Sequence, residues 1–274
     1  MKIAVTGSRG LVGSRVIELL KNEFEFIPLS SEELDITEKK AVETKLDSVE
    51  YDLLLHLAAY TNVEGAENEK EKAHAINVDG TKNLLDHVIK EGKKMIYVST
   101  DFVFDGKLPP YDEKSMPNPV GYYGKSKFEG EEIVKGKAMI VRISYPYGAQ
   151  SGGKPDFVER LKSILKLGKP LTMIADAAMT PTFIDDIAYG LSHLMKNFKP
   201  EIYHLVGGKS YTPFEVGGII AKKCGLPESL ILPTTFAEYS KGKSPRPQYS
   251  IIMTSKNDFY KMRTFEEGVN SVAS

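Results

Sequence analysis

The sequence predicts an α/β fold in which a doubly wound parallel sheet (Rossmann-like) is joined to a smaller, loop-rich substrate lobe. Three observations lead to this prediction. Short apolar runs alternate with helical patterns through the first half of the chain. A glycine-rich turn follows the first apolar run. Small and polar residues follow several later runs, where the carboxyl ends of parallel strands would border a ligand crevice.

The first expected strand covers residues 3–5, and a turn with the spacing G-x-x-G-x-x-G leads from it into a helix. Gly7 would permit the tight turn, Gly10 would let a pyrophosphate approach the backbone, and Gly13 would let helix and strand pack closely. Free amides at the helix start would face phosphate oxygens. The turn therefore predicts a dinucleotide cofactor, with an ordinary tight turn as the alternative. Its expected contacts here are Gly7, Arg9, Gly10, Leu11, Val12 and Gly13.

The end of a second expected strand, over residues 24–29, bears on the choice of cofactor. NAD-binding proteins often place an acid there to bind the ribose hydroxyls. This chain has Ser30 instead, and Arg9 in the glycine turn would reach a 2′-phosphate. Both features favour NADPH. Glu32 and Glu33 follow closely, so NADH remains the alternative.

Two further segments are expected at the cofactor. Asp35, followed by Ile36, would meet the adenine, or Asp35 would cap the helix that follows. A buried strand over residues 52–57 runs into Ala58 and Ala59. Small residues at the carboxyl end of a strand let a cofactor lie against the backbone, although they also suit simple tight packing. The expected contacts in this segment are Leu57, Ala58, Ala59 and Tyr60.

Strands over residues 95–98 and 139–143 extend the predicted sheet, and polar residues follow both. They are Ser99, Thr100 and Asp101 after the first strand, and Ser144 and Tyr145 after the second. All of them would lie at the same edge of the sheet as the glycine turn, where Ser99 would contact the cofactor. Between these strands and the earlier ones, a helix expected from residue 74 carries Asn77, whose amide would form hydrogen bonds in the fold or lie in solvent.

Tyr123 and Lys127 lie four residues apart and would share one face of a helix. Pro117 and Pro119 cannot lie inside a helix, so this helix should begin after them. A lysine ammonium beside a phenol favours the phenolate and would lower the pKa of Tyr123 from its usual value of about 10. Such a phenol can exchange a proton during a reaction. The alternative is a surface pair that meets by chance.

Composition narrows the function classes. The chain has 274 residues, of which 41% are hydrophobic, so it can bury a core. A net charge of -1 gives no reason to expect nucleic acid or a membrane surface as a partner. The single cysteine, Cys224, excludes an internal disulfide framework, and no zinc-like cluster or other metal site is expected. A strand at residue 3 leaves no room for a signal peptide, so we expect a cytoplasmic protein.

We expect two parts in the chain. Residues 1–148 would form the dinucleotide-binding domain, joined by part of 180–206. Residues 149–179 and 207–274 would form the smaller substrate-binding lobe, where several prolines predict many loops. A helix over 157–167 and a late strand over 202–206 are the regular elements expected here.

Seven segments of this sequence together resemble the dTDP-4-dehydrorhamnose reductase family, within the extended short-chain dehydrogenase/reductase superfamily. They are 7–13, HLAAYTNVE at 56–64, STDFVFDG at 99–106, YGKSK at 123–127, RISYPYG at 142–148, PT at 181–182 and RP at 246–247. The resemblance covers nearly the whole chain, and the STDFVFDG run is its most specific mark.

The resemblance implies an NADPH-dependent reductase of a 4-keto-6-deoxy sugar nucleotide, converting dTDP-4-dehydrorhamnose to dTDP-L-rhamnose. Tyr123 would protonate the ketone oxygen as hydride arrives, and Thr100 would orient the same oxygen. Lys127 would hold the nicotinamide ribose and lower the pKa of Tyr123. The resemblance also implies a homodimer. The implied substrate contacts are Thr100, Asp101, Tyr145 and Arg246.

Departures from the family pattern leave the sugar nucleotide open. Tyr145 stands where the family usually has tryptophan, and the chain contains none; Pro146 is also atypical. Arg246 would bind the substrate diphosphate, cap a helix or form a surface ion pair. A sugar-nucleotide dehydratase or epimerase is one alternative function. Related dehydratases usually carry a glutamate after the Thr-Asp pair, where this chain has Phe102, which cannot transfer protons. A non-catalytic NADP-binding subunit, like the regulatory subunit of methionine adenosyltransferase, is the other alternative.

Overall fold

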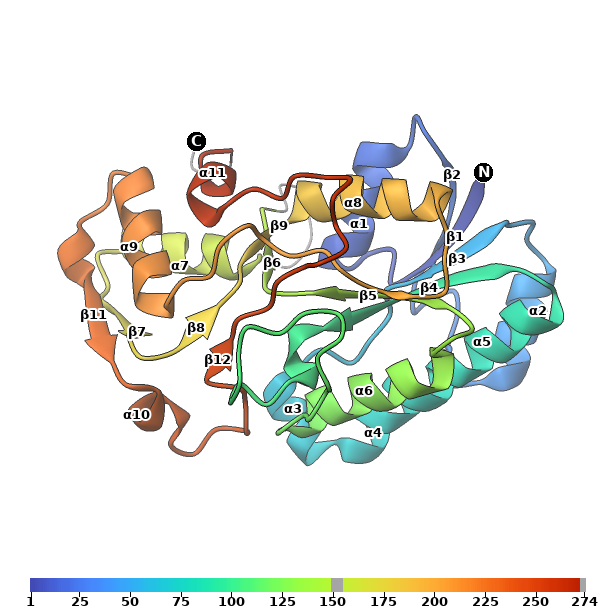
Figure 1. Cartoon of the computed structure of the whole chain (residues 1–274), viewed down its shortest axis with the longest axis horizontal. Coiled ribbons are helices and arrows are strands. Elements are labelled where there is room, and N and C mark those ends of the chain that lie inside the picture. The colour runs from blue at the N-terminus through green and yellow to red at the C-terminus, as the bar shows by residue number, and fades with distance from the viewer. Residues whose placement is uncertain (149–154, 272–274) are drawn as a thin grey trace.

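The computed structural model describes residues 1–148 and 155–271 and confirms the α/β fold (Figure 1). Its main sheet has six parallel strands in the order β10-β5-β4-β3-β1-β2. The strands are β1 (Lys2–Thr6), β2 (Glu25–Leu29), β3 (Leu53–His56), β4 (Lys94–Thr100), β5 (Met139–Ile143) and β10 (Ile202–His204). The chain order changes direction at β1, which pairs with β2 on one side and β3 on the other. Ligands bind at such a switch point.

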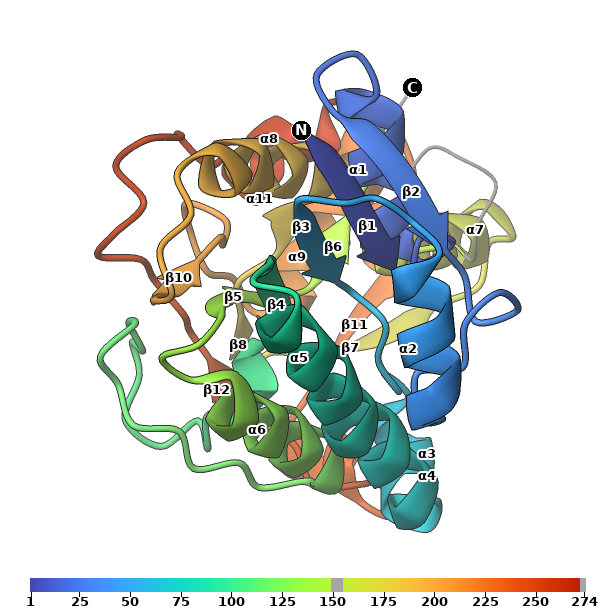
Figure 2. The ribbon, with the colours of Figure 1, turned by 90° about the vertical axis from the view of Figure 1, so that its right-hand side faces the viewer.

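Helices cover both faces of this sheet (Figure 2). One face carries α1 (Leu11–Leu20) and α8 (Ile184–Lys196), and the other carries α2 (Lys39–Asp47), α5 (Gly80–Lys90) and α6 (Tyr122–Val134). Alternate strand residues supply the two cores, as a pleated strand requires. Ile3 and Val5 pack in the core with α1 and α8, whereas Ala4 between them packs in the core with α2 and α5.

The connection from β3 to α5 differs from the expected helix. That helix was expected from residue 74, but α3 (Val63–Asn68) and α4 (Lys70–His74) precede this point. A π-helical turn (Ala75–Asp79) then joins α4 to α5. A π turn inserts one residue into a helix and often marks a functional site. A 3₁₀ turn (Asp101–Val103) follows β4.

The smaller lobe, on the left in Figure 1, is built from short elements. Its helices are α7 (Phe157–Lys166), α9 (Pro213–Lys223), α10 (Phe236–Ser240) and α11 (Phe265–Val269), with a 3₁₀ turn at Glu228–Leu230. Three parallel pairs of strands join β7 (Leu171–Ile174) to β11 (Ile231–Thr234), β8 (Ala178–Met179) to β12 (Tyr249–Ser250), and β6 (Pro146–Tyr147) to β9 (Thr182–Phe183). The expected boundary at residue 149 lies outside the described residues, so the division into two parts stays a prediction.

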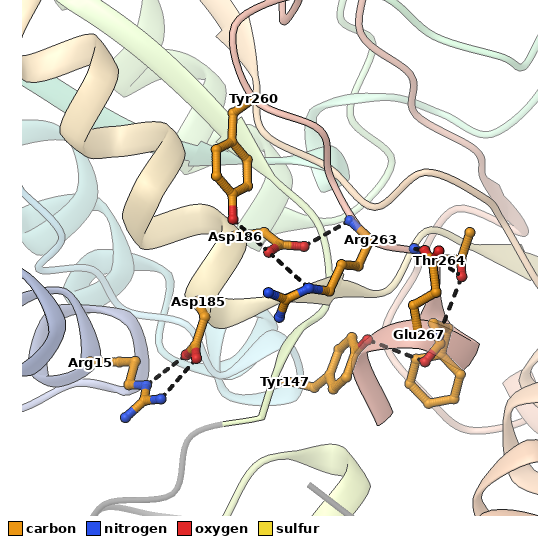
Figure 3. A network of polar contacts seen from close by, with 9 residues as sticks. Arg15, Tyr147, Asp185, Asp186, Tyr260, Arg263, Thr264 and Glu267 are labelled. Carbon is orange, nitrogen blue, oxygen red and sulfur yellow. Dashed lines mark hydrogen bonds and ion pairs between the residues drawn. The ribbon is translucent and has the colours of Figure 1, made fainter. Parts of the chain in front are cut away.

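The first turn of α8 contacts both α1 and the C-terminal segment (Figure 3). Asp185 binds Arg15 of α1 through two hydrogen bonds of 2.6 and 2.8 Å. Asp186 faces the other way, accepting from the Tyr260 hydroxyl at 3.1 Å and from the Arg263 amide at 2.7 Å. Both carboxylates are largely buried, so α1 and the C-terminal segment are held at fixed positions relative to α8. No helix in the described part of the chain is long and apolar enough to cross a membrane.

Candidate active site

Two glycines of the turn after β1, Gly7 and Gly13, have no room for a side chain. Gly7 has a φ of +69°, and a Cβ there would lie 2.7 Å from the Ala58 nitrogen. A Cβ at Gly13 would overlap the carbonyl oxygen of Gly7, so α1 lies directly on the turn. The Gly10 amide closes the turn by donating to the same oxygen at 2.9 Å. No side chain caps α1 and no acid lies in its first turn, which leaves its amides suited to an anion.

Three buried serine hydroxyls along this edge of the sheet have no hydrogen-bond partner among the residues that the structure describes. They belong to Ser8 after β1, Ser30 after β2 and Ser99 at the end of β4. Buried polar groups are nearly always hydrogen-bonded, so these hydroxyls fit a polar ligand in the crevice. The expectation that Ser30 and Ser99 contact a cofactor remains a prediction. Ser8 is not among the predicted cofactor contacts. Its position inside the glycine turn, as a residue with a hydroxyl group, is the signal that could have indicated such a contact.

Arg9 and Asp35 have local partners in this structure. Arg9 forms an ion pair with Glu32, and both side chains are exposed. Asp35 accepts hydrogen bonds from the Thr37 amide at 2.9 Å and the Thr37 hydroxyl at 2.7 Å. The N-cap of α2 is Glu38, so the alternative that Asp35 caps this helix is wrong. Contact of Asp35 and of the buried Ile36 with adenine stays a prediction.

Asn77 holds the segment that follows β3. Its side chain is buried within the π turn and accepts from the Tyr60 amide at 2.8 Å. It donates to the Tyr60 carbonyl at 3.2 Å and to the Ser126 hydroxyl of α6 at 2.9 Å. The alternative of a solvated Asn77 is therefore wrong. This amide fixes Ala58, Ala59 and Tyr60 against the helix that carries Tyr123 and Lys127.

Thr100 and Tyr123 come together at the carboxyl end of β4. The helix α6 begins at Tyr122, after the two prolines, as expected. Burial raises the pKa of Tyr123, and the neighbouring Thr100 hydroxyl opposes this shift. The Tyr123 ring packs edge-on against Phe102 with ring centres 5.6 Å apart, and Tyr145 lies on Phe102 at 6.2 Å. Thr100, Tyr123 and Tyr145 therefore all lie against Phe102.

Lys127 does not act on Tyr123 in the expected way. Its ammonium donates to the Val98 carbonyl at 2.8 Å and lies 4.0 Å from the centre of the Tyr97 ring. Burial lowers the pKa of Lys127 to about 7, against an opposing effect of Glu131. Burial also raises the pKa of Tyr123 to about 12. The prediction that Lys127 lowers the pKa of Tyr123 is wrong, because the ammonium binds a backbone carbonyl and burial dominates the pKa of the phenol.

Asp101 is only 2% exposed, and hydroxyls surround its carboxyl group. The Thr100 oxygen lies 3.1 Å from Oδ1, and the Ser144 hydroxyl donates to Oδ2 at 3.0 Å. Ser250 of β12 also donates to Oδ2. Burial raises the pKa of Asp101, while these hydrogen bonds oppose the shift. The group therefore joins the ends of β4 and β5 to the smaller lobe, and its expected contact with substrate stays a prediction.

Tyr145 and Arg246 lie near this position. Tyr145 has a φ of +41°, which side-chain-bearing residues rarely adopt, and strain of this kind gathers at functional sites. Arg246 forms an ion pair with Glu64 of α3 and donates to the Ser244 carbonyl at 3.2 Å. Of the alternatives for Arg246, the ion pair is thus present, while a role toward a diphosphate stays a prediction. Within residues 1–148 and 155–271, no group of three or more acidic, histidine or cysteine side chains is placed to hold a metal.

The chain is similar in sequence to known proteins. A sequence model described as the RmlD substrate binding domain matches residues 1–274. The dTDP-4-dehydrorhamnose reductase of Aggregatibacter actinomycetemcomitans is 34% identical over 75% of this chain and 73% of its own. Subunit beta of methionine adenosyltransferase 2 from Xenopus tropicalis is 30% identical over 89% of this chain and 77% of its own.

A solved structure extends the likeness to the whole fold. The dTDP-4-dehydrorhamnose reductase of Bacillus anthracis, crystallised in complex with NADP, superposes with a TM-score of 0.91 at 31% sequence identity. The match covers 98% of this chain and 96% of that chain.

Proposed function

Because this chain belongs to the RmlD substrate binding domain family, we propose that it is an NADPH-dependent reductase that converts dTDP-4-dehydrorhamnose to dTDP-L-rhamnose. The observation that carries the proposal is the position of Thr100 and Tyr123 at the carboxyl edge of the sheet, where Thr100 ends β4 and the Tyr123 ring packs against Phe102. Lys127 lies one helical turn beyond Tyr123. The relatives named dTDP-4-dehydrorhamnose reductase support the choice of sugar nucleotide.

The residues along the crevice fit a dinucleotide. The glycine turn and the uncapped amides of α1 would hold its pyrophosphate. The unpartnered hydroxyls of Ser8, Ser30 and Ser99 would gain hydrogen bonds from it. When bound, NADPH supplies the hydride that the reduction requires. The crystal structure of a relative with NADP supports this cofactor.

Tyr123 would supply the proton. A phenol with a pKa of about 12 is fully protonated near neutral pH, so the acid form is present when substrate binds. As hydride reaches the carbonyl carbon, the O–H bond of Tyr123 breaks and its proton moves to the carbonyl oxygen. Thr100 would orient that oxygen, and Lys127 would hold the ribose hydroxyls. The tyrosinate then recovers a proton from solvent.

NADPH turnover is the direct test of this function. Purified protein is mixed with NADPH and dTDP-4-dehydrorhamnose, absorbance of the reduced cofactor is followed, and the sugar product is identified by mass. We expect oxidation of NADPH with one equivalent of dTDP-L-rhamnose formed. Binding of NADPH without any turnover would contradict the proposed reductase activity and favour a non-catalytic binding subunit. The similarity to subunit beta of methionine adenosyltransferase 2 is the observation that makes this second function a candidate.

The preference for NADPH is a separate prediction. Arg9 would leave its ion pair with Glu32 and bind the 2′-phosphate of NADPH, because a phosphate carries more charge than one carboxylate. Ser30 would lie beside the same phosphate. We expect Arg9→Gln to weaken NADPH binding ~10-fold or more while leaving NADH binding nearly unchanged, as measured by fluorescence titration. Arg160→Gln, on an exposed position of α7, is the matched control. Equal losses for both cofactors would contradict this role of Arg9.

Assembly is open to a simple measurement. The expected homodimer stays a prediction, and light scattering of the purified protein gives the mass that decides it.

A further inference from the structure

We propose that Asp101 carries a proton in the working enzyme and donates it to the Thr100 hydroxyl, so that Thr100 directs its own hydrogen at the substrate carbonyl oxygen. Asp101 is then a positioning residue, which acts through Thr100. This inference rests on the proposed reductase function and deepens it, since it says which group donates and which accepts in the hydrogen bonds around the substrate carbonyl.

The surroundings of Asp101 favour its neutral form. The side chain is buried, and in the described part of the chain no lysine, arginine or histidine nitrogen lies within 4.0 Å of its carboxyl oxygens. A buried carboxylate without a cation is costly, whereas a protonated carboxyl group is tolerated. The titratable groups that face it are Tyr123 of α6 and Tyr145 after β5, and a charge on Asp101 would raise the pKa of both.

The hydrogen-bond capacity of Thr100 makes the polarity matter. Its hydroxyl has one hydrogen and two lone pairs, and the Phe102 amide already donates to it at 3.3 Å. One hydrogen and one lone pair remain for Asp101 and Tyr123. An ionised Asp101 would take the Thr100 hydrogen, and Tyr123 would then point its proton at Thr100 rather than at the substrate. A protonated Asp101 donates instead, which frees the Thr100 hydrogen for the carbonyl oxygen.

The two serines determine which oxygen holds the proton. Ser144 and Ser250 both donate to Oδ2 of Asp101, while Oδ1 has only the Thr100 oxygen at 3.1 Å. The acidic hydrogen therefore belongs on Oδ1, directed at Thr100. Since Ser250 lies on β12 of the smaller lobe, this arrangement also requires that lobe to be seated against the sheet.

The variant Asp101→Asn tests the polarity because an amide copies the protonated acid. Its nitrogen would donate to Thr100, and its oxygen would accept from Ser144 and Ser250. We expect this variant to keep kcat within about tenfold of the original, whereas Asp101→Ala loses ~10² or more. We also expect the original kcat to fall as rising pH ionises Asp101, and the asparagine variant to lack that fall.

Loss of kcat in Asp101→Asn as large as in Asp101→Ala would overturn the proposal, because it would mean that the ionised carboxylate is needed. An infrared difference spectrum between the original protein and Asp101→Asn, both ligand-free, gives a second measurement without turnover. We expect the original protein to show the carbonyl band of a protonated carboxylic acid that Asp101→Asn lacks. The control variant Asp105→Asn should keep this band, because the carboxylate that it removes has a lowered pKa. Absence of the band overturns the proposal, whereas a band in a protein that reduces no sugar nucleotide would leave only the proposed function failing.

Discussion

Burial moves the pKa values of Tyr123 and Lys127 in opposite directions. It raises the pKa of the phenol to about 12 and lowers the pKa of the ammonium to about 7. Both shifts favour neutral side chains in the ligand-free crevice. The proposed chemistry uses Tyr123 as the acid, so a protonated phenol before substrate binds is the useful state.

Tyr123→Phe removes the proposed proton donor while keeping the ring that packs on Phe102. We expect kcat to fall ~10² or more, the usual contribution of a general acid, with NADPH affinity nearly unchanged. The assay is steady-state NADPH oxidation, together with a binding titration. Tyr122→Phe, one residue away on the same helix, serves as the control and should retain turnover. Full activity of Tyr123→Phe would mean that another group supplies the proton.

The lowered pKa of Lys127 makes the free energy of unfolding depend on pH. A lysine of an unfolded chain has a pKa of 10.5, whereas burial lowers the folded value to about 7. Between these values the unfolded chain binds more protons, so the free energy of unfolding of the ligand-free protein should rise with pH. The contribution of Lys127 approaches about 1.4 kcal/mol for each pH unit.

Lys127→Met should remove this contribution. Urea unfolding across pH 7 to 10 would then show a smaller rise in stability than the original protein, and the variant should be the more stable of the two at pH 7. The exposed Lys125→Met on the same helix is the control and should follow the original slope. If the free energy of unfolding changed with pH in the same way for the original protein and Lys127→Met, burial would not lower the pKa of Lys127 and the prediction would be wrong.

The sequence predicted which residue types meet at the site better than it predicted their hydrogen bonds. The spacing of Tyr123 and Lys127 indicated a shared helix face, and the prolines indicated its start at Tyr122. It did not reveal that the Val98 carbonyl would bind the ammonium, because that acceptor comes from a neighbouring strand. Likewise, nothing local distinguished a buried Asn77 from a solvated one, since its partners, Tyr60 and Ser126, are 17 and 49 residues away.

At the scale of elements, the glycine turn packs directly against α1, and this contact would position the amides of α1 for the proposed cofactor. The turn is closed by its own backbone, and α1 starts immediately after it. Any side chain between the two would push the helix away from the phosphate position. The glycine at position 13 is therefore required by packing inside the protein.

Gly13→Ala tests this contact. Its new methyl group would overlap the Gly7 carbonyl, so we expect a loss of about 1–3 kcal/mol in the free energy of unfolding and weaker NADPH binding. Gly218→Ala in α9 is the matched control, since a Cβ there meets nothing within 4 Å. That control should stabilise the protein by up to about 1 kcal/mol. Unchanged NADPH affinity in Gly13→Ala would contradict the proposed role of the turn.

Elements with a clear period were predictable, and short ones were not. The strand expected over residues 139–143 matches β5, and the helix expected over 157–167 nearly matches α7. The two-residue strands β6, β8, β9 and β12 carry no period that a sequence could reveal. The π turn also escaped prediction, because its apolar pattern continues that of the flanking helices.

At the scale of the whole molecule, polar contacts join the smaller lobe or the C-terminal segment to the sheet domain. They include those of Asp186 with Arg263, Asp101 with Ser250, and Glu64 with Arg246. Each joins residues that are far apart in the sequence. The parallel sheet itself followed from local patterns, whereas these connections depend on how the two parts pack, which local patterns do not contain.

Hydride transfer to a sugar carbonyl beside Tyr123 is the central step of the proposed function. The most direct measurement uses NADPH deuterated at the transferred position with dTDP-4-dehydrorhamnose, followed by mass and proton spectra of the product. We expect dTDP-L-rhamnose carrying a single deuterium at the carbon that was the ketone. A product without deuterium, or deuterated cofactor that remains unoxidised beside intact substrate, would contradict the account.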